Sequence, residues 1–292
     1  MQYGKRAVQR RRAQFAACQD YGAHQRRKMF DAFMDASSVA TGDTVLDIGA
    51  TSDRTYDHSN YFEEWFPHKA QITALGIADA RHLQQFYDGL HFVRGDGRAL
   101  PFKDNSFDYI HSSAVQHVGS RDMQARFLAE LWRVARKGIF VTTPNRWFPV
   151  EFHTVLPLLH WLPPRLFRSV LYWIGHDFFA REENLNLLSA GSLAQIADRA
   201  GIKYYAIDAV SLFGWPTNLL LFGNKSRAFS SSPHPGALSL CSSVAKKNPA
   251  RAGLVRPKSL RRTNRRSTIA AFGSDRKARP RLCEAGAGPS LE

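Results

Sequence analysis

The chain has 292 residues, 44% of them hydrophobic, which is enough for one sizeable core and a small second lobe. Its three cysteines fit no metal-ligand spacing and are too few for a disulfide framework, which favours a reducing, cytoplasmic location. The formal net charge of +15 belongs to the two ends, because residues 1–28 hold 8 basic and 1 acidic side chains, residues 226–292 hold 14 and 3, and residues 29–225 hold 18 and 21. The acidic middle argues against nucleic-acid binding by the core.

The two ends differ from the body of the chain in composition. Residues 1–38 are predicted to form a basic helical segment, with a short helix at about 24–38, and they lack the apolar run of a secretory signal peptide. Residues 226–292 are rich in Ser, Ala, Arg, Lys, Gly and Pro, which predicts a disordered basic tail. This tail either has no dedicated role or binds RNA or acidic surfaces without specificity. The chain has no stretch of about 18 uninterrupted apolar residues, so no transmembrane helix is predicted.

The main domain, residues 39–225, begins a regular alternation of strands and helices. The predicted strands are 44–48, 72–77, 91–94, 107–112 and 139–143, and the predicted helices between them are 61–66, 81–87 and 122–136, the last closed by Lys137-Gly138 as a glycine C-cap. After a helix at 192–200, two more strands are predicted at 203–209 and 218–222 as an antiparallel pair. The alternation predicts an α/β, Rossmann-like doubly wound sheet that is mostly parallel, with an antiparallel C-terminal strand pair.

An insertion at 146–190 interrupts the alternation. Aromatic and apolar side chains concentrate at 147–180, where prolines divide the chain into short helices or turns. One interpretation is a helical apolar cap that closes an active site and excludes water. The other is a surface that binds an apolar or lipid-linked acceptor or lies on a membrane, with Arg165 and Arg168 contributing charge.

Acidic residues follow three of the predicted strands. Asp47 and Gly49 stand at the end of the first strand, Asp79 lies just past the second, and Asp96 follows the third. In open α/β sheets, ligands bind outside the carboxyl ends of the strands, and a glycine there allows close approach to the backbone. The recurrence therefore predicts a nucleoside-like ligand at this edge of the sheet.

These positions belong to a longer pattern. It consists of Val45-Leu46-Asp47-Ile48-Gly49-Ala50, Asp79, Gly95-Asp96-Gly97-Arg98-Ala99-Leu100-Pro101-Phe102, Ser106-Phe107-Asp108-Tyr109-Ile110, Gln116-His117-Val118 and Thr143-Pro144-Asn145. Over about residues 40–222 the chain resembles the class I S-adenosylmethionine-dependent methyltransferases, and within them the type 11 methyltransferase family. The resemblance implies that the cofactor is S-adenosyl-L-methionine.

The resemblance also implies which residues bind the cofactor. They are Asp47, Gly49 and Ala50 at the methionine part, Asp79 at the ribose hydroxyls, Asp96 and Gly97 at the adenine, and Ser113 at the transfer site. The chain departs from the family pattern at four points. Two of them are a longer loop between the first two strands and Gln116-His117-Val118 where the family often has Glu-His-Val. The other two concern the turn and the ribose site. Thr51 stands where the turn usually has its second glycine, and Ala78 stands where the ribose acid is usual, so that Asp79 comes one residue late.

Methyl transfer is an in-line displacement that depends on alignment, and a general base assists when the acceptor is a hydroxyl or an amine. The candidate bases are His117, His111, His153 and Glu151, and the family resemblance supports His117; for each of them a structural role is the competing interpretation. Asn145, Arg146 and Trp147, just beyond the fifth strand, are expected to touch the acceptor. The predicted catalytic residues are His117, Asn145 and His153, and no metal site is predicted.

From the sequence we expect a cytoplasmic methyltransferase that acts on an O or N of a small or lipid-like acceptor, with peripheral membrane contact through 147–180 as a second possibility. Two alternatives remain open. One is a protein that binds S-adenosylmethionine without catalysis, given the departures at Thr51 and Ala78. The other is an RNA methyltransferase that uses the basic ends as an electrostatic handle.

Overall fold

The structure, a computed structural model, describes residues 22–53 and 58–226. The first 21 residues and the predicted tail beyond Ser226 therefore lie outside the described residues. The N-terminal helix predicted at about 24–38 is present and spans residues 22–37.

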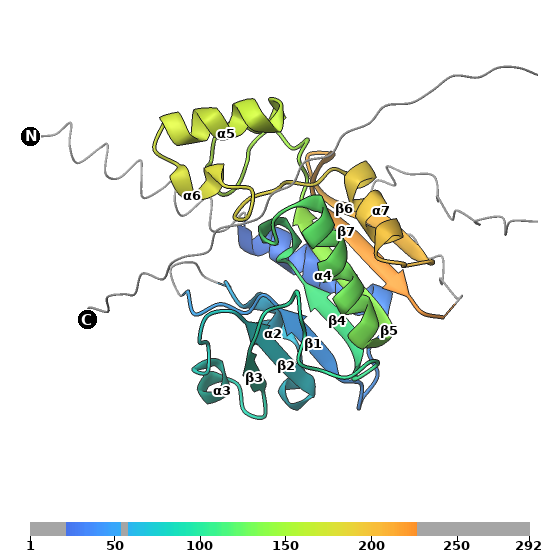
Figure 1. The fold of residues 1–292 in the computed structure, drawn as a ribbon. Coiled ribbons are helices and arrows are strands. Elements are labelled where there is room, and N and C mark those ends of the chain that lie inside the picture. Colours follow the sequence, from blue (N-terminus) through green and yellow to red (C-terminus); the bar gives the residue numbers. More distant parts are fainter. Residues whose placement is uncertain (1–21, 54–57, 227–292) are drawn as a thin grey trace, which may run out of the picture. The chain divides into compact units, whose positions relative to one another are not determined.

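A seven-stranded sheet with the order β3-β2-β1-β4-β5-β7-β6 forms the centre of the domain (Figure 1). Its strands are β1 (Val45–Ile48), β2 (Ile72–Gly76), β3 (His91–Arg94), β4 (Phe107–Ser112), β5 (Ala135–Pro144), β6 (Tyr205–Leu212) and β7 (Trp215–Asn224). The pairs among β1 to β5 are parallel, and β7 runs antiparallel to both β5 and β6. This topology confirms the predicted doubly wound sheet with an antiparallel C-terminal pair.

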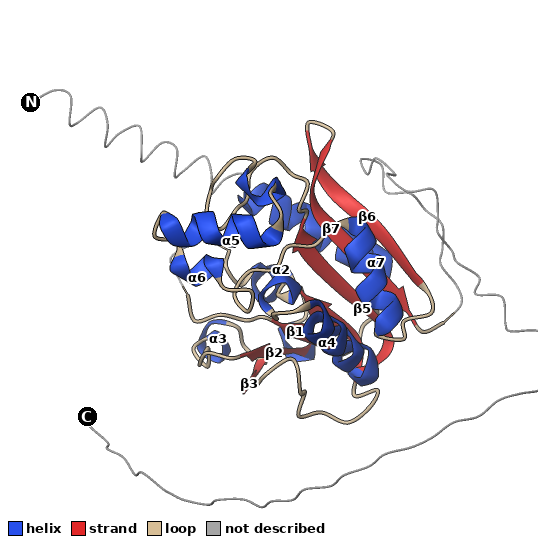
Figure 2. Ribbon diagram, turned by 45° about the horizontal axis from the view of Figure 1, so that its top comes forward, coloured by secondary structure: helices blue, strands red, loops and turns tan. Residues whose placement is uncertain are grey.

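Helices cover both faces of the sheet. They are α2 (Tyr61–Trp65), α3 (Leu83–Phe86), α4 (Arg121–Val134), α5 (Pro164–Trp173), α6 (Asp177–Ala180) and α7 (Ala190–Arg199), with the 3-10 turns η1 (Lys69–Gln71), η2 (Val115–His117) and η3 (Leu159–Trp161). On one face α4 and α7 lie side by side and bury Phe127, Leu131 and Leu193 (Figure 2). On the other, helix 22–37 and α2 pack Phe33 and Phe62 against the sheet.

The end of α4 differs from the prediction. The helix stops at Val134, and Ala135 already has extended backbone. Lys137 and Gly138 do not cap the helix but belong to β5, where Gly138 pairs with Tyr109 on one side and Asn224 on the other. A Cβ atom at Gly138 would lie 2.6 Å from the carbonyl oxygen of Gly223. The glycine therefore serves close strand pairing rather than a helix end.

The predicted insertion contains α5 and α6, which contact each other outside the two layers that flank the sheet (Figures 1 and 2). They form a small core of their own from Phe167, Leu171, Leu185 and Leu187. Its helical character agrees with the cap interpretation. No helix among residues 22–53 and 58–226 is both long and apolar enough to cross a membrane.

Candidate functional site

Gly49 makes the turn that follows β1. Its φ is +123°, a conformation that side-chain-bearing residues rarely adopt, and a Cβ there would lie 3.2 Å from the Cβ of Ala114. The backbone N–H groups of Gly49 and Ala50 both donate to the carbonyl of Leu75, at 2.9 and 3.2 Å. These hydrogen bonds fix the turn to β2, and because Gly49 has no side chain, its backbone is uncovered at the edge where the ligand is predicted.

Thr51 fits this turn without a second glycine. It is not among the described residues with positive φ, so its backbone has no need of glycine. The side-chain amide of Asn60 holds it from both sides, because Asn60 Oδ1 accepts from Thr51 N and Asn60 Nδ2 donates to Thr51 O, each at 2.9 Å. The departure from the family pattern at Thr51 is therefore compensated by Asn60, which the sequence did not single out.

Below the turn, Asp47 is buried in a polar cluster with Glu63, His111 and Tyr61. His111 Nδ1 contacts Asp47 Oδ1, and the Tyr61 hydroxyl lies 3.1 Å from His111 Nε2. Glu63 shares a hydrogen bond with Asp47. The ring of Phe62 stacks on the ring of His111, with the ring centroids 4.3 Å apart, and covers this side of the cluster. Asp47 therefore has the partners that a buried carboxylate needs.

The protonation states of the cluster follow from its burial. Burial raises the pKa of Asp47 to about 7, against the lowering effect of the hydrogen bond from Glu63. Burial and the neighbouring charge of Asp47 raise the pKa of Glu63 well above its ordinary range, so Glu63 keeps its proton and donates it. Burial lowers the pKa of His111 to about 3, so its ring is neutral. We therefore assign Nδ1 of His111 as the donor to Asp47 and Nε2 as the acceptor from Tyr61.

The two other predicted cofactor carboxylates lie at the same edge and are partly exposed. Asp79, past β2, pairs with Arg81 at 2.6 Å, and Asp96, past β3, pairs with Arg98 at 2.6 Å. Hydrogen bonds from Arg81 lower the pKa of Asp79 to about 2. Hydrogen bonds from Arg98 lower the pKa of Asp96. Both groups are thus ionised acceptors, each held in place by the arginine two residues later.

Gly97 and Ser113 lie close to the same edge. A Cβ at Gly97 would lie 2.5 Å from Cε2 of Phe127, so this glycine lets the loop pack onto α4. Ser113 follows β4 and is half-buried, and its carbonyl accepts from the Gln116 side chain at 3.0 Å. The structure therefore brings the predicted cofactor residues to one edge of the sheet.

Two of the predicted catalytic residues meet although they are far apart in the sequence. The rings of His117, in η2, and His153, in the insertion, are 4.8 Å apart and perpendicular. His153 Nδ1 lies 2.6 Å from Oε1 of Glu151, a buried carboxylate that also accepts from the backbone N–H and the hydroxyl of Thr154. Glu151, weighed as a base on sequence grounds, thus has the role of orienting His153.

In the tautomers that we assign from the partners of Nδ1, Nε2 is the unprotonated nitrogen of both histidines. His153 donates from Nδ1 to Glu151, and His117 donates from Nδ1 to the carbonyl of Asn184 at 2.6 Å. Burial and the hydrogen bonds of Glu151 act in opposite directions on its pKa, and the bonds to His153 and Thr154 prevail and lower it to about 2. The surrounding protein and His153 lower the pKa of His117, although part of its side chain remains exposed.

Asn145 and His111 have contacts within the chain. Asn145 Nδ2 donates to the Pro216 carbonyl at 3.0 Å, and its Oδ1 accepts from the Trp147 backbone at 3.1 Å, which closes the turn after β5. His111 lies inside the sheet and faces Asp47 rather than the cap. The cluster of His117, His153 and Glu151 is therefore the better candidate for proton transfer.

Sequence reasoning missed Glu63 as part of the site. It belongs to the run Tyr61-Phe62-Glu63-Glu64-Trp65, in which two adjacent acids on one short helix suggest an exposed face. In the structure Glu63 is buried and Glu64 is half-buried and pairs with His58. The orientation of α2 against β1 decides which of the two acids is buried, and the local sequence does not indicate this orientation.

Comparison with known proteins gives the following matches. Residues 46–142 match a family model described as a methyltransferase domain. A phthiotriol/phenolphthiotriol dimycocerosates methyltransferase of Mycobacterium ulcerans is 40% identical over 75 residues, which are 24% of this chain and 27% of that protein. A ubiquinone/menaquinone biosynthesis C-methyltransferase UbiE of Hahella chejuensis is 35% identical over 123 residues, 40% of this chain and 47% of that protein. The matches thus span between about a quarter and half of the length of these relatives.

Among solved structures, a Thermotoga maritima protein described as an SAM-dependent methyltransferase and possible histamine N-methyltransferase aligns with 68% of this chain and 89% of its own. The TM-score is 0.45 and the sequence identity is 16%.

Proposed function

We propose that this chain, whose residues 46–142 belong to the methyltransferase-domain family, transfers a methyl group from S-adenosylmethionine to an apolar, lipid-like acceptor. The observation that carries the proposal is the shared edge at the carboxyl ends of β1 to β4. There the bare Gly49 turn, the ionised Asp79 and Asp96, and Ser113 come together. No P-loop or metal ligand set is needed for such a cofactor.

The residues at this edge fit the cofactor. The positive φ of Gly49 leaves room for close approach to the backbone, and Asp47 lies beneath as a carboxylate that titrates near neutrality. A cationic neighbour favours the ionised form of Asp47. Asp79 is placed to accept from the ribose hydroxyls, and Asp96 from the adenine amino group. When bound, S-adenosylmethionine supplies an electrophilic methyl group.

The chain's own contribution to the chemistry is alignment and proton removal. In our proposal, Nε2 of His153 or His117 takes the proton of the acceptor. Glu151 fixes the His153 ring and stabilises the imidazolium that forms, because its ionised carboxylate lies 2.6 Å from Nδ1. The cap brings His153 to His117 and keeps water away from the reacting groups.

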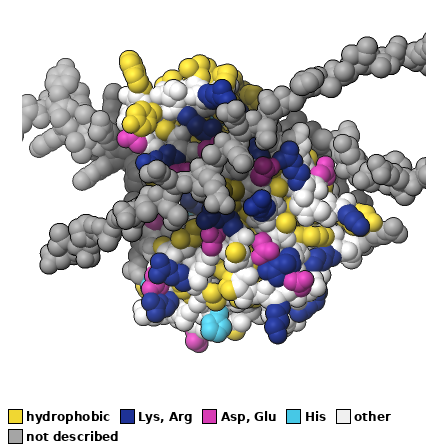
Figure 3. Space-filling view, in the orientation of Figure 1, with side chains coloured by type: hydrophobic (Ala, Val, Ile, Leu, Met, Phe, Trp, Pro, Cys, Tyr) yellow, Lys and Arg dark blue, Asp and Glu magenta, His cyan; other side chains and the backbone are white. Residues whose placement is uncertain are grey.

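The cap supports an apolar acceptor. Figure 3 shows hydrophobic side chains gathered over α5, with basic side chains beside them. The most exposed of these residues are Trp173, Tyr172 and Phe178, which are 91%, 68% and 62% exposed. Aromatic side chains with this exposure suit the boundary between water and lipid. We therefore extend the proposal to peripheral contact with a membrane that holds the acceptor.

The names of the relatives bear on the atom that is methylated. UbiE is named a C-methyltransferase of ubiquinone and menaquinone biosynthesis, and the mycobacterial relative is named for dimycocerosates. These names favour transfer to carbon over the O or N expected from the sequence. We propose an aromatic acceptor carbon ortho to a phenolic hydroxyl, because removal of the hydroxyl proton gives a phenolate with negative charge on that carbon. The carbon attacks the methyl group, S-adenosylhomocysteine leaves, and loss of the proton on that carbon restores the aromatic ring.

The test uses S-adenosylmethionine with a ¹³C-labelled methyl group. The full chain is incubated with a prenylated quinol, a long-chain alcohol, a long-chain amine and bulk tRNA, and products are identified by mass spectrometry and NMR. A labelled methyl on a quinol carbon is the expected result, and Glu151→Gln should reduce its formation without weakening cofactor binding. Labelled tRNA would favour an RNA methyltransferase, and cofactor binding without any product would favour a non-catalytic protein.

A further inference from the structure

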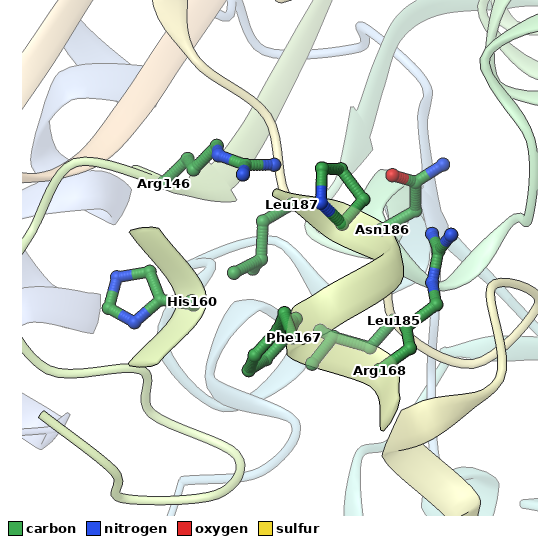
Figure 4. Close-up of a pocket in the computed structure, with 8 residues that line it drawn as sticks. Arg146, His160, Phe167, Arg168, Leu185, Asn186 and Leu187 are labelled. Carbon is green, nitrogen blue, oxygen red and sulfur yellow. The ribbon is translucent and has the colours of Figure 1, made fainter. Parts of the chain in front are cut away.

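A small pocket lies within the insertion, where α5 meets Arg146 and the segment 185–187 (Figure 4). Two guanidinium groups, those of Arg146 and Arg168, line it together with the apolar side chains of Phe167, Leu185 and Leu187. Arg146 follows the carboxyl end of β5, and Arg168 comes from α5. We call this site the arginine pocket.

The arginine pocket stands beside the candidate catalytic cluster. The segment 184–188 connects them, because Asn184 accepts from His117 and the backbone N–H of Asn186 donates to the carbonyl of Gln116 at 2.9 Å. The carbonyl of Leu188 accepts from Arg146 N at 2.8 Å. The same backbone segment therefore contacts both the pocket and His117.

Positive charge exceeds negative charge around the pocket. Burial lowers the pKa of Arg121 and of Arg146, and neighbouring guanidinium groups lower them further: Arg146 and Arg168 act on Arg121, and Arg168 acts on Arg146. Glu182 is the carboxylate that faces them among the described residues, and it pairs with Arg168 at 3.4 Å. Three guanidinium groups against one carboxylate leave an excess of two positive charges. Such an excess in a half-buried site attracts an anion.

The three arginines differ in how far the chain satisfies them. Arg121 donates to Gln124 Oε1 and to the carbonyl of Leu187, at 2.7 and 2.6 Å, and so holds the segment in place. The Arg146 side chain donates to the Leu162 carbonyl at 3.0 Å, and Arg168 reaches Glu182. A guanidinium has five N–H donors in a planar fork, so Arg146 and Arg168 retain donors for a ligand.

We propose that the arginine pocket binds the carboxylate or phosphate group of an apolar molecule. The two guanidiniums match such an anion, and the buried side chains of Phe167, Leu185 and Leu187 form the apolar wall against which it would lie. Under the proposed function, this molecule is the methyl acceptor, so that part of the inference rests on that function. The competing interpretation is structural, with both arginines merely pinning the cap to the domain.

Titration calorimetry on the full chain separates the interpretations, with octyl phosphate and octanoate as anionic probes and octanol as the neutral probe. The chain provides a matched control on α5, since Arg165 is exposed and does not line the pocket. We expect Arg168→Gln and Arg146→Gln to weaken octyl phosphate binding by about tenfold or more, and Arg165→Gln by less than about twofold. Arg168→Lys should fall between, because lysine keeps the charge but not the fork.

Three outcomes would overturn the proposal. The first is equal weakening by Arg165→Gln and Arg168→Gln, which would mean attraction by general surface charge. The second is octanol binding as tightly as octyl phosphate. The third is inorganic phosphate binding as tightly as octyl phosphate, which would mean a site for the free anion. Thermal unfolding of each variant shows whether the cap stays folded, and Arg168→Lys keeps the test decisive if Arg168→Gln unfolds it.

The two proposals fail in different ways. Asp47→Ala should abolish S-adenosylmethionine binding and leave octyl phosphate binding intact, whereas Arg168→Gln should do the reverse. A chain that binds octyl phosphate through Arg168 but never binds S-adenosylmethionine would refute the proposed function and support the pocket. The pocket proposal alone would be refuted if the chain binds the cofactor, binds octanol as tightly as octyl phosphate, and keeps its octyl phosphate affinity in the Arg168→Gln variant.

Discussion

Glu63→Gln is expected to stabilise the protein, although it changes a buried residue that touches Asp47. Glu63 is almost fully buried and keeps its proton in the folded state, while in the unfolded chain it ionises with its ordinary pKa of 4.5. Because the folded-state pKa is raised, its contribution to stability is lost as pH rises above 4.5. The loss is at most about 1.4 kcal/mol for each pH unit above 4.5, and it stops once the pH passes the raised pKa of the folded state.

Glutamine removes this penalty because it does not ionise, and its amide still donates to Asp47. Glu63 Oε1 already has no hydrogen-bond partner in the described part of the chain. Glutamine adds one buried N–H group without an acceptor at this position, which costs about 1 kcal/mol. The expected net effect of Glu63→Gln is therefore a gain in stability that grows with pH above 4.5. Near pH 4.5 it should turn into a small loss.

Urea unfolding of the full chain between pH 4.5 and 8 measures the effect. The free energy of unfolding of the natural protein should fall with pH more steeply than that of Glu63→Gln, by up to about 1.4 kcal/mol per unit. Glu64→Gln is the matched control, because Glu64 is a half-exposed neighbour paired with His58. Parallel pH curves for the natural protein and Glu63→Gln would show that Glu63 is ionised in the fold and that the assigned proton is misplaced.

Three further outcomes are expected. The affinity for S-adenosylmethionine should weaken below pH 7, by up to about tenfold per pH unit, because the sulfonium favours ionised Asp47, whose pKa is about 7. Calorimetry should show a weaker pH dependence for S-adenosylhomocysteine, which has no sulfonium charge, and no pH dependence in the Asp47→Asn variant. Glu151→Gln should lower kcat by about 10²-fold with unchanged cofactor Kd, and an unchanged kcat would exclude the His153 base. Trp173→Ser should reduce co-sedimentation with anionic vesicles, whereas Phe213→Ser, at an equally exposed aromatic on the β6–β7 turn, should not.

Much of the fold was predictable because parallel strands covered on both faces are apolar runs bounded by turns. The limits of 91–94 and 107–112 agree with β3 and β4, and 44–48 differs from β1 by one residue. The strands predicted at 139–143 and 218–222 were too short. Their extra residues, such as Lys137 and Gly138, gain strand conformation from pairing with β4 and β7, which are distant in sequence. In the sequence, a glycine that follows an amphipathic helix looks the same whether it caps the helix or belongs to the next strand.

The site was predictable to the extent that its parts are local. Asp79 and Asp96 follow strands directly, so the parallel sheet alone places them at one edge with Gly49. The partnership of Glu63 with Asp47 and that of His153 with His117 depend on how α2 and the cap pack, which is a property of the whole fold. Asn60 likewise compensates for Thr51 from nine positions later in the sequence, with a side chain that no local pattern distinguishes.

The division between the two halves of the site explains why the family match leaves the acceptor open. The matched region ends at residue 142, and the predicted cofactor residues all come before it. His153, Glu151, Arg146 and Arg168, which we assign to the acceptor, all come after it, in the insertion between β5 and α7. Segment 184–188 joins the halves, since it holds both His117 and Arg146. Under our proposal, a change of acceptor would involve the insertion and the surroundings of His117, whereas the residues proposed for the cofactor would stay the same.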